Sequence, residues 1–172
     1  MKSKWLVLAI VSGAQCAVQA QTVVNERTLS VMAANEAALA ALEHCRKDGH
    51  RVTVTVIDQA GRTKVVLRDD GSRPHALEHS YRKAYTALSY HAPSGEYGKR
   101  AAGNPLSAGP LHLSHITTSP GGLPIRAGKD VIGAIGISGS AGGAGAGAGG
   151  GGAIDERCAQ AGIDRVAQGL AN

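Results

Sequence analysis

Histidines carry most of the chemistry that this chain of 172 residues can offer, and two of the seven are paired by spacing. His75 and His79 stand four positions apart in a segment with helical periodicity, so both imidazoles lie on one helix face. Such a pair can hold a metal ion, or one neutral imidazole can ligate haem iron. Arg82 and Lys83 follow one turn later and can pair with haem propionates. The alternative is a solvated polar face, since a glutamate and a serine stand among them.

The other five histidines are weaker candidates. His91 ends the same helical segment and is as suited to bonding backbone carbonyls as to binding a ligand. His112 and His115 are an odd number of positions apart in a predicted strand, so only one of them can point at a given pocket. His44 and His50 flank the end of the first helix and are expected at the surface.

Other catalytic arrangements are not apparent. Asp69 and Asp70 could bind a cation together with Glu78, but paired acids after a strand are more often turn formers. Cys45 follows His44 directly, and adjacency alone does not make a nucleophile and base pair. No Ser-His-Asp or Cys-His set stands out, so an enzyme is the less favoured class.

The first 20 residues are typical of a secretory signal peptide. Lys2 and Lys4 precede an apolar run over residues 5–11, and a small-x-small pattern ends at Ala20. A membrane anchor would need about twenty apolar residues, and Gln15 disfavours lipidation at Cys16. Cleavage near Ala20 predicts a periplasmic or secreted protein with a single domain over residues 21–172.

Composition excludes two classes of partner. Without Lys2 and Lys4, 16 of the 18 basic residues remain against 13 acidic ones, a mature net charge of +3. That charge is scattered, and aromatic residues make up only 3% of the chain, so nucleic acid is not an expected partner. No later segment is apolar enough for stable insertion into a membrane.

Two cysteines remain after cleavage, Cys45 at the end of the first predicted helix and Cys158 near the start of the last. An oxidising compartment favours a disulfide if those helices pack antiparallel. Two buried free thiols are the alternative, and the sequence leaves both open.

The periodicities predict an α+β fold with a five-stranded, mainly antiparallel sheet flanked by helices, in the order α-β-β-α-(α)-β-β-β-α. A Gly/Ala tract over residues 139–153 is expected to be a flexible loop rather than a phosphate-binding loop. The predicted helices cover 28–47, 75–90, 93–102 and 155–170, and the predicted strands cover 51–57, 63–68, 111–118 and two runs within 121–139.

Glycines inside the last predicted strand imply a close neighbour. Gly133 and Gly136 alternate with large apolar residues, and glycine weakens a strand unless another backbone or a ligand approaches it. A helix, a neighbouring subunit or a porphyrin could fill that role. With the helix over residues 74–91, this strand could form an apolar slot for a tetrapyrrole.

Four blocks in order carry a family resemblance over residues 26–170. They are V-x-V-x-V-I-D-x-x-G (52–61), R-K-A-Y-T-A-L-S (82–89), G-G-L-P-I-R-A-G-K-D-V-I-G-A-I-G-I-S-G (121–139) and D-E-R-C-A-Q-A-G-I-D (155–164). Together they resemble the GlcG/HbpS family of haem-binding or haem-degrading domains. The long Gly/Ala tract departs from the short turn usual in that family.

The resemblance implies a profilin-like fold, haem or another tetrapyrrole as cofactor in some members, and homo-oligomers. The favoured hypothesis is therefore an exported protein that binds haem for sequestration, transport or sensing. The alternatives are an enzyme acting on haem or on a small carboxylic acid, with Arg126 and Lys129 recognising carboxylates, and a non-catalytic oligomeric scaffold. The candidate ligand-binding residues are His75, His79, Arg82, Lys83, His91, His112, His115 and Arg126, with His75 and His79 as the metal pair.

Overall fold

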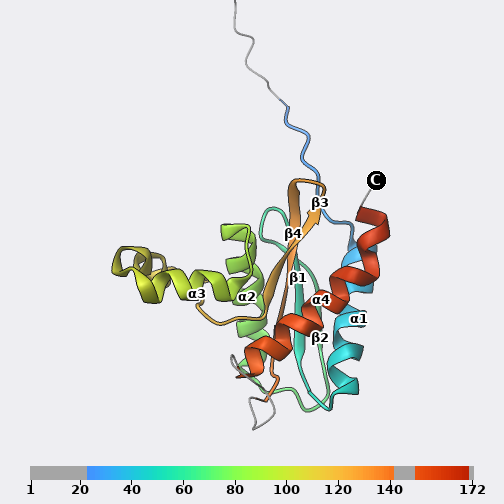
Figure 1. Ribbon diagram of the computed structural model, residues 1–172. Coiled ribbons are helices and arrows are strands. Elements are labelled where there is room, and N and C mark those ends of the chain that lie inside the picture. Colours follow the sequence, from blue (N-terminus) through green and yellow to red (C-terminus); the bar gives the residue numbers. More distant parts are fainter. Residues whose placement is uncertain (1–22, 142–149, 171–172) are drawn as a thin grey trace, which may run out of the picture.

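The protein is a three-layer domain in a computed structural model that describes residues 23–141 and 150–170. Helices α1 and α4 cover one face of a central sheet, and α2 covers the other (Figure 1). The predicted signal peptide lies outside the described residues, as does the 142–149 part of the Gly/Ala tract. Among the described residues, no helix has the length and apolar character needed to cross a membrane.

The sheet has four antiparallel strands in the order β2-β1-β4-β3. They are β1 (Thr53–Asp58), β2 (Thr63–Arg68), β3 (Gly122–Ala127) and β4 (Asp130–Ser138). Both faces of β1 and most of β4 are buried, because helices pack on both sides of these two central strands. The α+β class and the flanking helices are therefore confirmed.

The described residues form five helical segments: α1 (Val31–Lys47), α2 (Ala76–Tyr90), α3 (Ser94–Gly103), the 3-10 segment η1 (Pro105–His112) and α4 (Gly150–Leu170). Helix α4 begins earlier than the sequence predicts, so residues 150–153 are helical rather than loop. The segments α3 and η1 project from the α2 side of the body (Figure 1).

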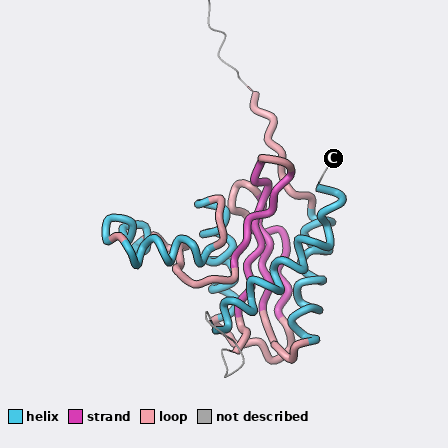
Figure 2. Tube along the Cα trace, in the orientation of Figure 1, coloured by secondary structure: helices cyan, strands magenta, loops and turns pink. Residues whose placement is uncertain are grey.

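The prediction of a fifth strand over residues 111–118 is wrong. This stretch contains the end of η1 and an irregular connection to β3, which Figure 2 shows as loop. Pro105 and Pro110 favour the tight helical turns of η1, which extends through His112 into the predicted strand. Ile116 is the stretch's buried apolar residue, so no alternating face exists to dock on the sheet. The backbone N–H of Thr117 instead donates to the side chain of Thr86 at 3.0 Å.

Gly122 of β3 and Gly136 of β4 admit helix α2, whereas a Cβ atom on Gly133 would overlap the backbone of Ile57 in β1. A Cβ atom on Gly136 would overlap the backbone of Ser80 and Ala84, and one on Gly122 would overlap the backbone of Lys83. Close approach of a helix therefore explains Gly122 and Gly136. The described residues of β4 and α2 leave no room between them for a tetrapyrrole, so the predicted slot at this position is wrong.

Two apolar clusters hold the layers together. The larger one lies between the sheet and the α1/α4 layer, and the smaller one lies between the sheet and α2. A disulfide joins Cys45 of α1 to Cys158 of α4, with a Cα–Cα distance of 5.6 Å. The two helices pack against each other through small residues, since a Cβ on Gly162 would overlap the backbone of Ala37. The sequence left a disulfide and two buried free thiols open, and the structure contains the disulfide.

Candidate functional site

Helix α2 separates the candidate residues into groups at its two ends. Asp70 and Gly71 form a turn before Pro74, and the helix begins with His75 in the N-cap position. It ends at His91, which adopts a left-handed conformation with φ 52°. His75, His79, Arg82 and Lys83 belong to the N-terminal half, whereas His91 marks the C-terminal end.

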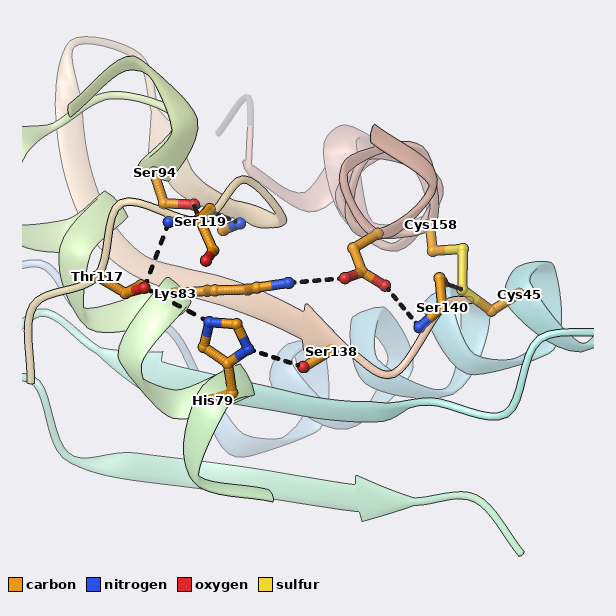
Figure 3. Close-up of polar contacts among 11 residues, drawn as sticks. Cys45, His79, Lys83, Ser94, Thr117, Ser119, Ser138, Ser140 and Cys158 are labelled. Carbon is orange, nitrogen blue, oxygen red and sulfur yellow. Dashed lines mark hydrogen bonds and ion pairs between the residues drawn. A yellow bond between two sulfur atoms is a disulfide. The ribbon is translucent and has the colours of Figure 1, made fainter. Parts of the chain in front are cut away.

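His79 is half-buried between two hydroxyl groups from other parts of the chain. Its Nδ1 lies 3.2 Å from Oγ of Ser138, at the end of β4, and its Nε2 lies 3.4 Å from Oγ1 of Thr117 (Figure 3). The backbone N–H of Ser119 also donates to that threonine oxygen. Thr117 can therefore accept from Nε2–H while Ser138 donates to Nδ1, an assignment inferred from the hydrogen bonds. Both ring nitrogens of His79 are engaged within the protein.

Burial and nearby positive charge keep His79 neutral. Loss of hydration, followed by repulsion from Lys83, lowers the pKa of His79 from 6.5 to about 4. Because the folded-state pKa lies below the unfolded one, protonation favours the unfolded chain. The resulting penalty is absent above about pH 6.5 and is complete below about pH 4.

We expect acidification between these two pH values to lower the free energy of unfolding through His79 by about 1–3 kcal/mol, after discounting for partial exposure. Urea denaturation at a series of pH values measures the effect. The His79→Gln variant keeps hydrogen-bonding groups but does not titrate here, so the difference between the two pH profiles isolates the histidine. Parallel profiles would contradict the assignment.

Lys83 and Asp155 form a buried ion pair beside His79. Nζ of Lys83 lies 2.7 Å from Oδ2 of Asp155 in α4, and each side chain is only 3% exposed. The backbone N–H of Ser140 donates to the other carboxylate oxygen at 3.3 Å. Burial raises the pKa of Asp155, and attraction to Lys83 opposes that rise. The pair bridges the α2 and α4 layers at the end of β4.

These groups line a hollow of about 310 Å³, which we call the polar pocket. Its walls come from the start of α2, the end of β4, the loop before β3 and the first turn of α4. The described residues that define it are Arg73, His75, His79, Lys83, Ser119, Pro120, Ser138, Gly139, Ser140, Gly151, Gly152 and Asp155.

The outer face of the same end of α2 is open. His75, Glu78, His79 and Arg82 border a shallow groove there, and Arg82 donates to Glu78 at 2.6 Å. Nε of Arg82 is buried without a partner among the described residues. Within the described residues, no group of three metal-ligating side chains converges. The His75–His79 metal pair therefore stays a prediction.

A larger hollow of about 760 Å³, the rim pocket, lies at the C-terminal end of α2. Tyr85, Leu88 and Val131 give it an apolar wall, and His91 and Lys129 lie at its border. The backbone carbonyl of His91 accepts a hydrogen bond from the guanidinium of Arg126 at 2.5 Å. The imidazole of His91 is exposed and makes no hydrogen bond with the described residues. Its nitrogens are thus available to a ligand, unlike those of His79.

Neither His112 nor His115 lines the polar pocket or the rim pocket. The ring of His115 contacts Tyr81 and Tyr85 edge-on, with centroid distances of 5.2 and 5.3 Å. His112 is exposed in the projecting η1 segment. Sequence reasoning proposed no site role for Ser138, Thr117 or Asp155, although Asp155 opens one of the four resemblance blocks.

The chain belongs to the family described as haem-degrading HbpS-like proteins, whose sequence model matches residues 29–164. Curated proteins gave no match. Among solved structures, a double mutant of HbpS from Streptomyces reticuli is 34% identical, with a TM-score of 0.73, over 89% of this chain and 97% of that chain.

Two further solved structures share the fold. The ORFY protein from Klebsiella pneumoniae is 25% identical with a TM-score of 0.75, over 87% of this chain and 97% of that one. A second protein, PduOC, was solved as a complex with haem. It is also 25% identical, with a TM-score of 0.69, over 80% of this chain and 94% of that one.

Proposed function

We propose that the protein is exported and binds haem in the rim pocket at the C-terminal end of α2, for sequestration, transport or sensing. Family membership and the haem complex of a solved relative support haem as the ligand. The leader pattern of the first 20 residues supports export, and so does the Cys45–Cys158 disulfide, a bond typical of oxidising compartments.

The observation that carries the proposal is an exposed imidazole at the border of a pocket of suitable size with one apolar wall. Ligand pockets for molecules of this size span about 300–1,000 Å³ and are mostly apolar with a few polar groups. The rim pocket has about 760 Å³, with Tyr85, Leu88 and Val131 as its apolar wall. His91 is the side chain that would ligate iron there.

Two cationic side chains lie at or near the rim pocket and can pair with the haem propionates. Lys129 borders the rim pocket, and Arg126 reaches the backbone of His91 from β3. Charge-assisted hydrogen bonds from these two groups would hold the propionates. Haem, when bound, supplies a redox-active iron centre, and the chain's own residues supply its ligand and charge partners. His91 and Lys129 therefore suit the group, whereas the carboxylates of Glu26 and Asp130, which also border the pocket, have to lie away from its propionates.

Hemin titration of the mature protein tests the proposal. We expect a saturable Soret shift at micromolar hemin and its weakening by about tenfold or more in His91→Ala, because the ligating nitrogen is lost. His75→Ala and His79→Ala test the metal pair, and His50→Ala, which lines neither the polar pocket nor the rim pocket, is the matched control. No saturable shift would refute haem binding, and loss only in His75→Ala would move the site to the other end of α2.

The same samples separate a carrier from an enzyme that degrades haem. A carrier keeps its Soret band when a reductant is added, whereas a degrading enzyme loses it faster than free hemin does.

We also propose a homo-oligomer, supported by the exposed leucines of the projecting segment, such as Leu106 at 91% and Leu113 at 62% exposure. Light scattering of the haem-free sample measures this, and a monomer mass would contradict it.

A further inference from the structure

We infer that the polar pocket at the N-terminal end of α2 is a second binding site, which takes a small carboxylate. The pocket lies at the opposite end of α2 from the rim pocket, and none of its residues borders the rim pocket. Its volume of about 310 Å³ and its polar lining are unsuited to a tetrapyrrole and fit a polar molecule of a few heavy atoms. The inference is therefore independent of haem binding.

The inference rests on a buried ammonium group whose N–H donors are not all hydrogen-bonded within the described residues. Lys83 is 3% exposed, and Asp155 is its one hydrogen-bond partner among the described residues. An ammonium group has three N–H donors, so two have no acceptor among the described residues. Buried donors are nearly always satisfied. Because Lys83 lines the polar pocket, an acceptor bound there can take them.

Further donors converge on the same space. Arg73 lies exposed at the border of the pocket and forms no ion pair with the described residues. Gly151 and Gly152 belong to the first turn of α4, where backbone N–H groups have no intrahelical acceptor. The imidazole of His79 is neutral, so it adds no negative charge to the pocket. Because donors outnumber acceptors in this pocket, we expect it to bind an anion.

The arrangement favours a monoanionic carboxylate over phosphate. The planar guanidinium of Arg73 matches the two oxygens of a carboxylate, and Lys83 supplies a point charge. Asp155 already carries a carboxyl group in the pocket and is paired with Lys83. Its charge opposes a dianion more strongly than a monoanion. Ser138 and Ser140 provide hydroxyl oxygens that can accept a hydrogen bond from a hydroxyl group of the ligand.

Amide NMR on the haem-free mature protein tests the site with lactate, pyruvate, acetate and inorganic phosphate as probes. We expect saturable shifts at Gly139, Ser140, Gly151 and Gly152 with the carboxylates, and weaker binding of phosphate. Arg73→Gln is expected to weaken carboxylate binding by about tenfold. Arg157→Gln removes the same charge from an exposed position of α4 outside the pocket and should leave affinity unchanged.

A second variant protects the test against a folding artefact. Replacing both members of the buried pair, by Lys83→Met with Asp155→Leu, removes the polar centre without leaving a lone charge. This variant should stay folded and lose carboxylate binding, whereas His91→Ala should lose haem and keep the carboxylate. Absence of saturable shifts, equal binding by Arg73→Gln and the parent, or tighter binding of phosphate would each overturn the inference.

Discussion

Loss of the Cys45–Cys158 disulfide should lower the free energy of unfolding by roughly 3–5 kcal/mol. The two cysteines are 113 positions apart, so the bond closes a loop that includes most of the domain. In the chain-entropy account, such a long loop restricts the unfolded chain strongly. Both residues are also buried, at 0% and 1% exposure, between α1 and α4. Their removal therefore costs native packing as well.

Chemical denaturation with and without dithiothreitol measures this effect. The Cys45→Ala, Cys158→Ala double variant is the control, because it should match the reduced parent and ignore the reductant. Protein secreted through its own leader should show no free thiol when unfolded without reductant. Two titratable thiols in that sample would contradict both the disulfide and the proposal of an oxidising compartment.

Local patterns predicted most of the fold because they are properties of single segments. The alternation of Val52, Val54 and Val56 predicted β1, and the Asp58–Gly61 turn predicted its hairpin with β2. The alternation in β1 did not reveal that both of its faces are buried, since that depends on α2 packing opposite α1. The wrong fifth strand arose where apolar residues between prolines mimicked a strand.

The candidate site was less predictable because tertiary contacts assemble it. The helical spacing of His75, His79 and Lys83 was visible, but their partners lie far along the chain. Asp155 is 72 positions from Lys83, and Ser138 is 59 positions from His79. No local pattern reports such pairings, so a lysine expected to face haem propionates instead lies buried against an aspartate. The sequence predicted that His91 ends a helix, but it did not predict the pocket beside His91, because residues of the β3–β4 turn help to form that pocket.

The single substitution Lys83→Met is expected to lower the free energy of unfolding by about 3–5 kcal/mol. It leaves the carboxyl group of Asp155 buried with the backbone N–H and hydroxyl of Ser140 as its hydrogen-bonding neighbours among the described residues. Burial already raises the pKa of Asp155, and loss of Lys83 removes the attraction that holds it down. The variant should therefore bind a proton at Asp155 and recover part of its stability as the pH falls.

Removing the charge of Asp155 as well should restore most of the lost free energy of unfolding. Lys83→Met with Asp155→Leu is expected within about 1–2 kcal/mol of the parent, because apolar residues can replace a buried ion pair at little cost. Urea denaturation of both single variants and the double variant closes the cycle, and additive losses would contradict direct coupling. A near-neutral double variant would mean that the pair is not needed for folding. The two N–H donors of Lys83 that have no acceptor among the described residues would then be best explained by a ligand in the polar pocket.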